Sequence, residues 1–201
     1  MIDYLNSVSR HHGEYLPHLE VKCGTYFVTI CLDGAIPSKL HQRLKLERSR
    51  QLFELERQKR LTPEGRDAIE WGHFLKVDAL LDSPACQPVL GRDDIAQVVV
   101  DALEYFHGDR YVLDMWVIMG THIHVIFQLC AENLLQKVLH SWKSFTANEI
   151  NSLLGRAGRF WQRDYFDRSI RCDEQLAAIR EYVWANPEAA GLRDWKWRRQ
   201  Y

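Results

Sequence analysis

The chain has 201 residues, of which 46% are hydrophobic and 26% are charged, and its formal net charge at pH 7 is −1. This length is enough for one sizeable core, so we expect a single domain over residues 1–201. The apolar runs are only as long as strands, which argues against a membrane span, and the polar amino end does not resemble a signal peptide. Five scattered cysteines without a Cys-x-x-Cys pair favour reduced thiols in a cytoplasm over a disulfide framework or a thiolate zinc site.

The charge is unevenly distributed along the chain. Residues 137–201 carry 12 Lys and Arg against 8 Asp and Glu, so this third is basic although the whole chain is slightly acidic. A basic third is compatible with a polyanionic partner, although charged surfaces are usually only solvated.

The first half of the chain predicts a strand, an insertion and a helix. Residues 21–32 are rich in β-branched and aromatic side chains, which is typical of a strand. The composition then becomes charged and helix-favouring, and we expect a helical insertion over about 38–82. Asp93 is expected to cap an amphipathic helix that Gly108 stops.

The second half continues with a hairpin. The apolar runs 111–119 and 122–129 flank Gly120-Thr121, which suits a two-residue turn with glycine first. A helix with an apolar stripe from Leu134 follows, and residues 159–170 are expected to be extended. A last helix is predicted from Asp173 to Asn186, where Pro187 would end it.

The order of core elements is strand, helix, strand, strand, helix, strand, helix. This order predicts an α+β fold, a ferredoxin-like antiparallel sheet with helices packed on one face, plus the helical insertion. The carboxy-terminal tail, 193–201, is expected to dock against the domain. With the apolar face covered by helices, the opposite face of the sheet is expected to be open.

Two histidines lie on that opposite face. His122 and His124 alternate with apolar residues, so a strand directs both imidazoles to the same side. Such a pair is half of a metal site, because neutral imidazole is the commonest protein metal ligand. A solvated polar strand face explains the same pattern equally well.

The last helix offers a third ligand and a nucleophile. Tyr182 and Asn186 are four residues apart and therefore share one stripe of the helix. The amide oxygen of Asn186 could complete a His, His, Asn site, and that donor set suits Mg²⁺ or Mn²⁺. The same spacing also arises by chance, and an Asn near a helix end is often only a cap.

Five segments in this order resemble the REP-associated tyrosine transposases, relatives of the single-tyrosine transposases that carry a His-hydrophobic-His motif. They are Tyr26-Phe-Val-Thr, Val117-Ile-Met-Gly-Thr-His-Ile-His-Val, Leu139-His-Ser-Trp-Lys-Ser-Phe-Thr-Ala-Asn-Glu-Ile150, Phe160-Trp-Gln-Arg-Asp-Tyr-Phe-Asp-Arg168 and Tyr182-Val-Trp-Ala-Asn-Pro-Glu-Ala-Ala-Gly-Leu192. The resemblance runs from about residue 15 to the end of the chain.

The resemblance implies a metal-dependent endonuclease and strand transferase that acts on single-stranded DNA beside hairpins of palindromic repeats. It implies that Tyr182 attacks a DNA phosphate and leaves a 5′-phosphotyrosine, with His122, His124 and Asn186 as metal ligands. An unperturbed phenol, with a pKa of about 10, is a poor nucleophile at neutral pH unless its target is activated. A metal ion that neutralises the phosphate provides this activation.

The chain departs from the family pattern in two places. The family usually has Met-Pro-Asn before the first histidine, where this chain has Met119-Gly120-Thr121. The family often has Asn-Pro-Val-Lys-Ala-Gly-Leu, where this chain has Glu188 and Ala189 after the proline. The second departure removes a cation and adds an acid, as expected of a domesticated copy, but the nucleophile and the three ligand positions are intact.

Further residues are candidates for DNA contact because cations are interleaved with aromatic rings. These are Lys143, Arg159, Trp161, Arg163, Arg168 and Arg171. Each of them can equally be a core aromatic or a solvated cation. Tyr165, between Arg163 and Arg168, is a rival nucleophile that we rank below Tyr182.

Three functions therefore compete. The first is the tyrosine transposase, found in a bacterial cytoplasm, with a monomer favoured. The second is a catalytically silent protein that binds hairpin DNA on the same scaffold. The third is a metal-dependent hydrolase that uses the histidines and no tyrosine.

Overall fold

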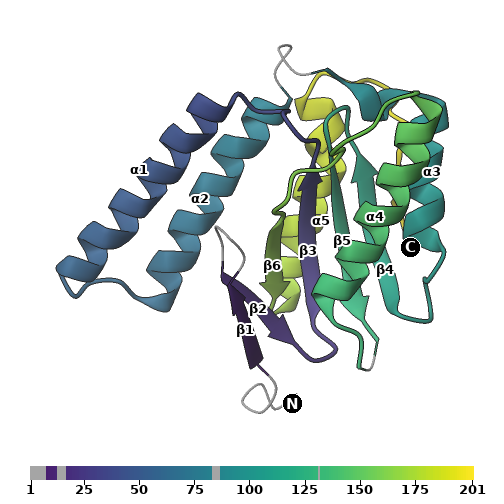
Figure 1. The fold of residues 1–201 in the computed structure, drawn as a ribbon. Helices are drawn as coiled ribbons and strands as arrows, with labels where there is room; N and C mark the ends of the chain where they lie inside the picture. The colour runs from purple at the N-terminus through teal and green to yellow at the C-terminus, as the bar shows by residue number, and fades with distance from the viewer. Residues whose placement is uncertain (1–7, 13–16, 83–86, 131) are drawn as a thin grey trace. The chain divides into compact units, whose positions relative to one another are not determined.

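The computed structural model describes residues 8–12, 17–82, 87–130 and 132–201. Its elements in chain order are β1 (Val8–His12), β2 (Pro17–Val21), β3 (Thr25–Cys31), α1 (Ser38–Arg57), α2 (Pro63–Leu81), η1 (Val89–Gly91), α3 (Asp93–Glu104), β4 (Tyr111–Ile118), β5 (His122–Leu129), α4 (Leu135–Leu153), β6 (Phe166–Ile170), α5 (Asp173–Ala189) and β7 (Arg198–Gln200). The chain forms two compact units, residues 34–87 and the remainder. Figure 1 shows these elements along the chain.

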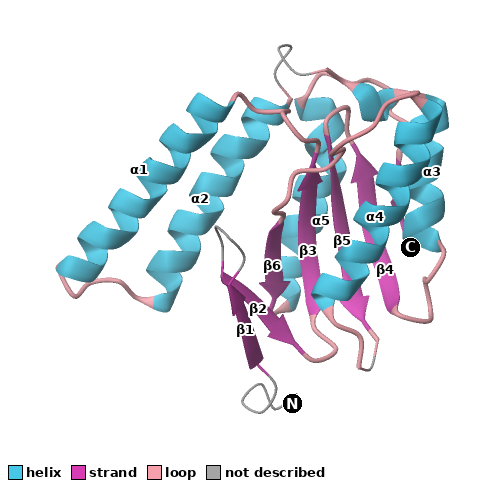
Figure 2. Ribbon diagram, viewed as in Figure 1, coloured by secondary structure: helices cyan, strands magenta, loops and turns pink. Residues whose placement is uncertain are grey.

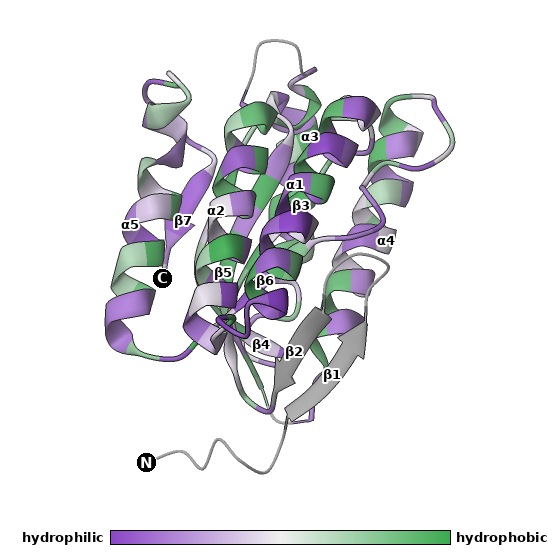
Figure 3. Cartoon of the chain, turned by 90° about the vertical axis from the view of Figure 1, so that its left-hand side faces the viewer, coloured by the Kyte–Doolittle hydropathy of each residue, from purple (hydrophilic) through white to green (hydrophobic). Residues whose placement is uncertain are grey.

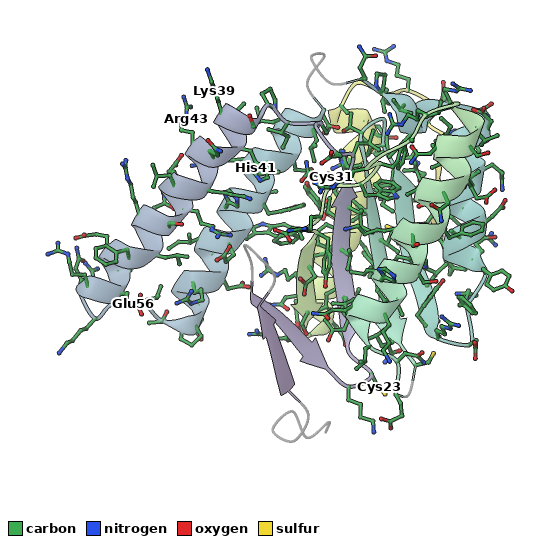
Figure 4. All side chains as sticks on the ribbon, viewed as in Figure 1. Cys23, Cys31, Lys39, His41, Arg43 and Glu56 are labelled. Atoms are coloured by element: carbon green, nitrogen blue, oxygen red, sulfur yellow. The ribbon has the colours of Figure 1, made fainter. Side chains whose placement is uncertain are left out.

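The smaller unit is the predicted helical insertion, a hairpin of α1 and α2. Thr62 caps α2 by accepting a hydrogen bond from the Gly65 amide at 3.0 Å. Arg48 and Glu70 form an ion pair between the two helices at 3.2 Å, with both side chains largely shielded from solvent. The side chains of Lys39 and Arg43, near the start of α1, point away from α2 (Figure 4).

The larger unit contains a five-stranded antiparallel sheet in the order β6-β3-β5-β4-β7. Strands β3, β4, β5 and β6 with α3 and α4 form the predicted ferredoxin-like arrangement, because each helix connects two strands that run in the same direction. Figure 2 shows the helices and strands of this α+β fold. The fold class is therefore confirmed, and β1 and β2 add a separate two-stranded sheet.

One face of the sheet forms the main core with α3 and α4. The ring of Phe127 on β5 lies 5.0 Å from that of Trp142 on α4. The Trp142 indole donates to the Tyr111 hydroxyl at 2.8 Å, and this hydroxyl donates to the Leu103 carbonyl at 2.8 Å. These two hydrogen bonds satisfy buried polar groups and join α3, β4 and α4.

The opposite face of the sheet is covered by α5, which lies across the sheet from α4 (Figure 3). Arg180 on α5 forms a short ion pair with Asp114, the residue at which the β4–β5 register shifts. Both histidines of β5 lie beneath this helix and are 0% exposed. The expectation of an open histidine face is therefore wrong, because one helix packs on that side as well.

The last helix also extends further than predicted. Pro187 lies inside α5, which continues to Ala189. The helix ends in a Schellman motif, in which Leu192 donates to the Pro187 carbonyl and Gly191 to that of Glu188, with Gly191 at a φ of 79°.

The carboxy-terminal tail docks as expected and adds strand β7 to the sheet. β7 pairs with β4, and the Trp195 indole donates to the Ile118 carbonyl at 2.8 Å. Lys196 and Trp197 bind the carboxylate of Asp93. Asp93 therefore lies in the first turn of α3 without capping it, and Arg92 is the residue at the cap position.

Within the described part of the chain, no helix combines the length and apolar character needed to cross a bilayer. Cys130 and Cys172 are free thiols. Cys23 and Cys31 lie at opposite ends of β3 (Figure 4). Cys86 lies outside the described residues.

Candidate active site

The two histidines of β5 form the centre of the site. Their Nε2 atoms lie 3.1 Å apart, and their ring centroids are 4.6 Å apart. The strand alternation that directs Ile123 toward α3 and α4 directs both imidazoles toward α5. The sequence prediction that the two rings share one face is in agreement with this geometry.

Two threonine hydroxyls hold the other ring nitrogens. The Thr121 hydroxyl lies 3.0 Å from Nδ1 of His122, and the Thr29 hydroxyl lies 2.7 Å from Nδ1 of His124. Thr29 is opposite His124 in the β3–β5 register, which brings its side chain to the same face. Sequence reasoning missed both threonines as site residues. The alternation of side chains along β3 places Thr29 on the histidine face, which is the signal that could have identified it.

This arrangement fits a divalent metal ion. When both Nδ1–H groups donate to threonine, the two Nε2 lone pairs face one another, and a cation between them removes the repulsion. Two nitrogens bound at roughly 2.1 Å and at right angles lie about 3 Å apart, close to the observed separation. The threonines then serve as the outer partners that usually orient metal-bound imidazoles.

Tyr182 lies beside this pair. Its ring centroid is 5.9 Å from that of His124, and the two rings are inclined at 63°. Phe27 of β3 packs against both, with ring centroids 5.5 Å from His124 and 6.2 Å from Tyr182. The Tyr182 side chain is half-buried, so the phenol lies at the margin of the site.

Asn186 lies one turn further along α5. It belongs to the buried stripe of this helix, together with Ile179, Val183 and Pro187, and is 5% exposed. A carboxamide in the stripe that faces the sheet is uncommon, because a buried polar group costs free energy unless it has a polar partner. This location is compatible with the predicted role of a third ligand.

The rival Tyr165 lies on the other face of the sheet. The Lys143 ammonium of α4 lies 5.8 Å from the centroid of the Tyr165 ring. The next residue, Phe166, packs against Phe27 on the histidine face, with ring centroids 6.0 Å apart. Since neighbouring side chains alternate along an extended chain, Tyr165 is directed away from the histidines.

The predicted DNA contacts divide into exposed and buried residues. Arg159, Arg163 and Arg171 are exposed, and Arg159 lies 3.7 Å from the Asp33 carboxylate. Arg168 is opposite Phe27 in the β3–β6 register, so it shares the histidine face. Trp161 is 4% exposed and must be corrected: its indole donates to the Thr146 hydroxyl at 2.8 Å inside the core, where no base can stack on it.

Lys143 is half-buried on α4. Its ammonium donates to the Arg163 carbonyl at 2.6 Å, which fixes the segment before β6 to this helix. Burial lowers the pKa of the Lys143 ammonium, and the nearby Asp164 carboxylate opposes that effect. An anion in the same place would stabilise the charged form further.

Both departures from the family pattern have structural explanations. A Cβ atom added to Gly120 would lie 2.6 Å from the Pro88 Cβ, so a close approach requires glycine in this turn. Gly120 does not have a positive φ, so the predicted two-residue turn with glycine first does not explain why glycine is present here. Glu188 forms an ion pair with Arg198 of β7 at 2.7 Å, which engages this acid with the tail.

Sequence comparison finds a similarity between part of the larger unit and a known family. The family described as "Transposase IS200 like" matches residues 93–186, a range that contains both histidines and Tyr182 and ends at Asn186. No curated protein is significantly similar to the chain.

The solved structures that are similar to the chain include the following two. One is a REP-associated tyrosine transposase bound to a REP hairpin, with a TM-score of 0.54 and 16% identity over 94% of this chain and 81% of that one. The other is a candidate transposase from Deinococcus radiodurans, with a TM-score of 0.42 and 11% identity over 89% of this chain and 98% of that one. The first supports the fold, and the second is too distant to add to it. Residues 93–186, slightly less than half of the chain, are thus similar to the IS200-like transposases, the group that the sequence motifs resemble.

Proposed function

We propose that the protein nicks and rejoins single-stranded DNA next to hairpins of palindromic repeats, through a covalent bond between Tyr182 and a 5′-phosphate. The observation that carries this proposal is the contact of the Tyr182 ring with His124, whose Nε2 lies 3.1 Å from that of His122. The family match to IS200-like transposases supports a DNA-cleaving and joining enzyme. The similar solved structure holds a REP hairpin, and we extend this partner to the present chain.

The chemistry requires three contributions from the chain. Tyr182 supplies the phenolic oxygen that forms a bond to phosphorus, while the bond from phosphorus to the 3′ oxygen breaks and that oxygen leaves as a free 3′-hydroxyl. His122 and His124, with Asn186, would hold Mg²⁺ or Mn²⁺, which supplies charge neutralisation at the phosphate. Thr29 and Thr121 would keep the two imidazoles in position through their hydrogen bonds.

The position of α5 supports the assignment of these roles. The same helix carries Tyr182 and Asn186, and its ion pair from Arg180 to Asp114 anchors it to β4. A nucleophile on a helix packed over the metal ligands is oriented before the substrate arrives, which favours reaction. Tyr165 does not meet this condition, because its ring lies against Lys143 on the opposite face.

The test is covalent trapping. A hairpin oligonucleotide with a single-stranded flank and a 3′-end label is incubated with the protein and Mn²⁺, because the fragment on the 3′ side remains bound to the enzyme. We expect a labelled protein band with the wild type and with Tyr165→Phe, and none with Tyr182→Phe or with a chelator. A band that persists in Tyr182→Phe refutes the assignment of the nucleophile.

The same experiment separates the competing functions. A silent DNA-binding protein would shift the hairpin in a gel and give no covalent band with any variant. A metal-dependent hydrolase would release free 5′-phosphate ends in Tyr182→Phe as fast as in the wild type. Either result contradicts the proposal.

A further inference from the structure

A groove of about 490 Å³ lies on the face of the sheet opposite to the histidine pair. One wall is α4, with Lys137 and His140, and the other is the segment before β6, with Arg163 and Tyr165. We call it the α4 groove. Its volume is in the range of sites that bind a small molecule or a single nucleotide.

The walls of the α4 groove are mainly basic. Lys137, Lys143 and Arg163 contribute three cations against the single carboxylate of Asp164. Lys137 and Arg163 are exposed, so their charges are available to an anion at the groove. Cations grouped around a concave surface attract a phosphate more strongly than the same cations dispersed on a flat surface.

The groove also contains an aromatic ring. The half-buried Tyr165 has the Lys143 ammonium 5.8 Å from its ring centroid, and the bond from this ammonium to the Arg163 carbonyl holds the two walls together. A nucleic-acid base stacks on such a ring whatever its sequence, while adjacent cations bind the backbone. Paired bases cannot stack in this way, because their faces are covered by neighbours in the duplex.

We propose that the α4 groove binds one unpaired nucleotide of the DNA substrate, with its base against Tyr165 and its phosphate between Lys137 and Arg163. This inference rests on the proposed function, because it takes single-stranded DNA as the substrate. The α4 groove is separate from the proposed catalytic site, because the sheet lies between them. Tyr165 lines the groove, whereas the side chain of Arg168 on β6 shares the histidine face. A strand bound at both sites therefore passes around the edge formed by β6.

The test uses fluorescent DNA and leaves the catalytic residues intact. The hairpin oligonucleotide carries 2-aminopurine at one flanking position at a time, and its fluorescence is followed as protein is added without metal. We expect stacking to quench one or two adjacent positions in the wild type and in Tyr165→Phe. The quenching is lost in Tyr165→Leu, with binding about tenfold weaker.

The charge contacts are tested by substitutions that leave the backbone bond from Lys143 to Arg163 in place. Lys137→Gln and Arg163→Gln should each weaken binding several-fold and reduce the slope of log K against log salt by about 0.7, the value per phosphate contact for a single strand. Arg193→Gln is the matched control, because it removes an exposed cation that does not line the groove and should change neither quantity. Binding to a fully paired duplex should be insensitive to Tyr165→Leu.

Three results overturn the inference: quenching that survives Tyr165→Leu, an equal loss of affinity in Arg193→Gln and Arg163→Gln, or an equal effect of Tyr165→Leu on duplex binding. Failure of the proposed function is distinguished by the covalent band. If the wild type gives no adduct while these groove variants behave as expected, then the catalytic proposal fails and the α4 groove stands as a single-strand site.

Discussion

Replacement of Thr29 by valine tests whether the threonines hold the proposed metal ligands His122 and His124. Thr29 is 2% exposed, and its hydroxyl lies 2.7 Å from Nδ1 of His124. Valine keeps the β-branched shape on β3 but removes the oxygen, so Nδ1 of His124 loses this buried hydrogen-bond partner. A buried polar group without its partner costs about 1–3 kcal/mol, and we expect the free energy of unfolding to fall by that amount. Loss of such an outer partner weakens metal affinity by roughly 10- to 100-fold.

Two measurements and one control make this prediction specific. Free Mn²⁺ is titrated by electron paramagnetic resonance, and the free energy of unfolding comes from urea denaturation without metal. Thr146→Val is the matched control, because its buried hydroxyl donates to the Trp142 carbonyl at 2.6 Å and accepts from Trp161, on the other face of the sheet. This variant should lose stability and bind Mn²⁺ as the wild type does. Unchanged Mn²⁺ affinity in Thr29→Val, or equal losses in both variants, would refute the reasoning.

Other predictions concern the scaffold. Gly120→Ala should destabilise the protein by about 1–3 kcal/mol in urea denaturation, because the new Cβ meets Pro88 at 2.6 Å. Gly72→Ala, in α2 with open space around it, should be neutral or stabilise by up to about 1 kcal/mol, and a loss there would contradict the steric argument. Burial raises the pKa of Tyr111 to about 12, so its protonated form favours the folded state. That contribution is complete below pH 10 and is lost as the pH rises toward 12. In the wild type the free energy of unfolding should fall by about 2–3 kcal/mol over this pH range, and in Tyr111→Phe this fall should be absent. A pH profile that is the same in both proteins contradicts this prediction. Deletion of residues 195–201 uncovers the edge of β4 and should lower the melting temperature and promote aggregation, seen by light scattering.

Patterns with a strong period predicted the core of the fold. The alternation around His122 and His124 correctly assigned a strand and its two faces, because a side-chain period of two permits no other arrangement in an extended chain. The apolar stripe from Leu135 to Trp142 likewise predicted α4. Phe145, three residues after Trp142, is 50% exposed, since the buried side of α4 continues through Thr146 and Ile150 instead.

Local patterns could not predict contacts between distant segments. The alternating aromatic and basic residues of 159–168 suit DNA binding and core packing equally well. The burial of Trp161 and its hydrogen bond to Thr146, a residue of α4, show that this side chain packs inside. Similarly, no local signal indicated that Gly120 meets Pro88, because that contact joins the hairpin to a loop far away in sequence. The sequence prediction ends the last helix at Asn186 because a proline usually ends a helix. It does not consider the motif around Gly191, which ends α5 after Pro187.

The two tyrosines provide a final argument that joins fold and chemistry. Tyr182 reaches the histidine pair from α5, whereas Tyr165 precedes a strand whose pairing with β3 fixes its orientation from Phe166 to Ile170. Rotation about side-chain bonds cannot bring the Tyr165 hydroxyl through a sheet to the other face. A shift of one residue would turn Phe166 away from Phe27 and bring Asp167 to the histidine face instead. Formation of a covalent adduct at Tyr165 would therefore require β6 to separate from β3. The identity of the residue that carries the DNA thus tests the strand register as directly as it tests the catalytic assignment.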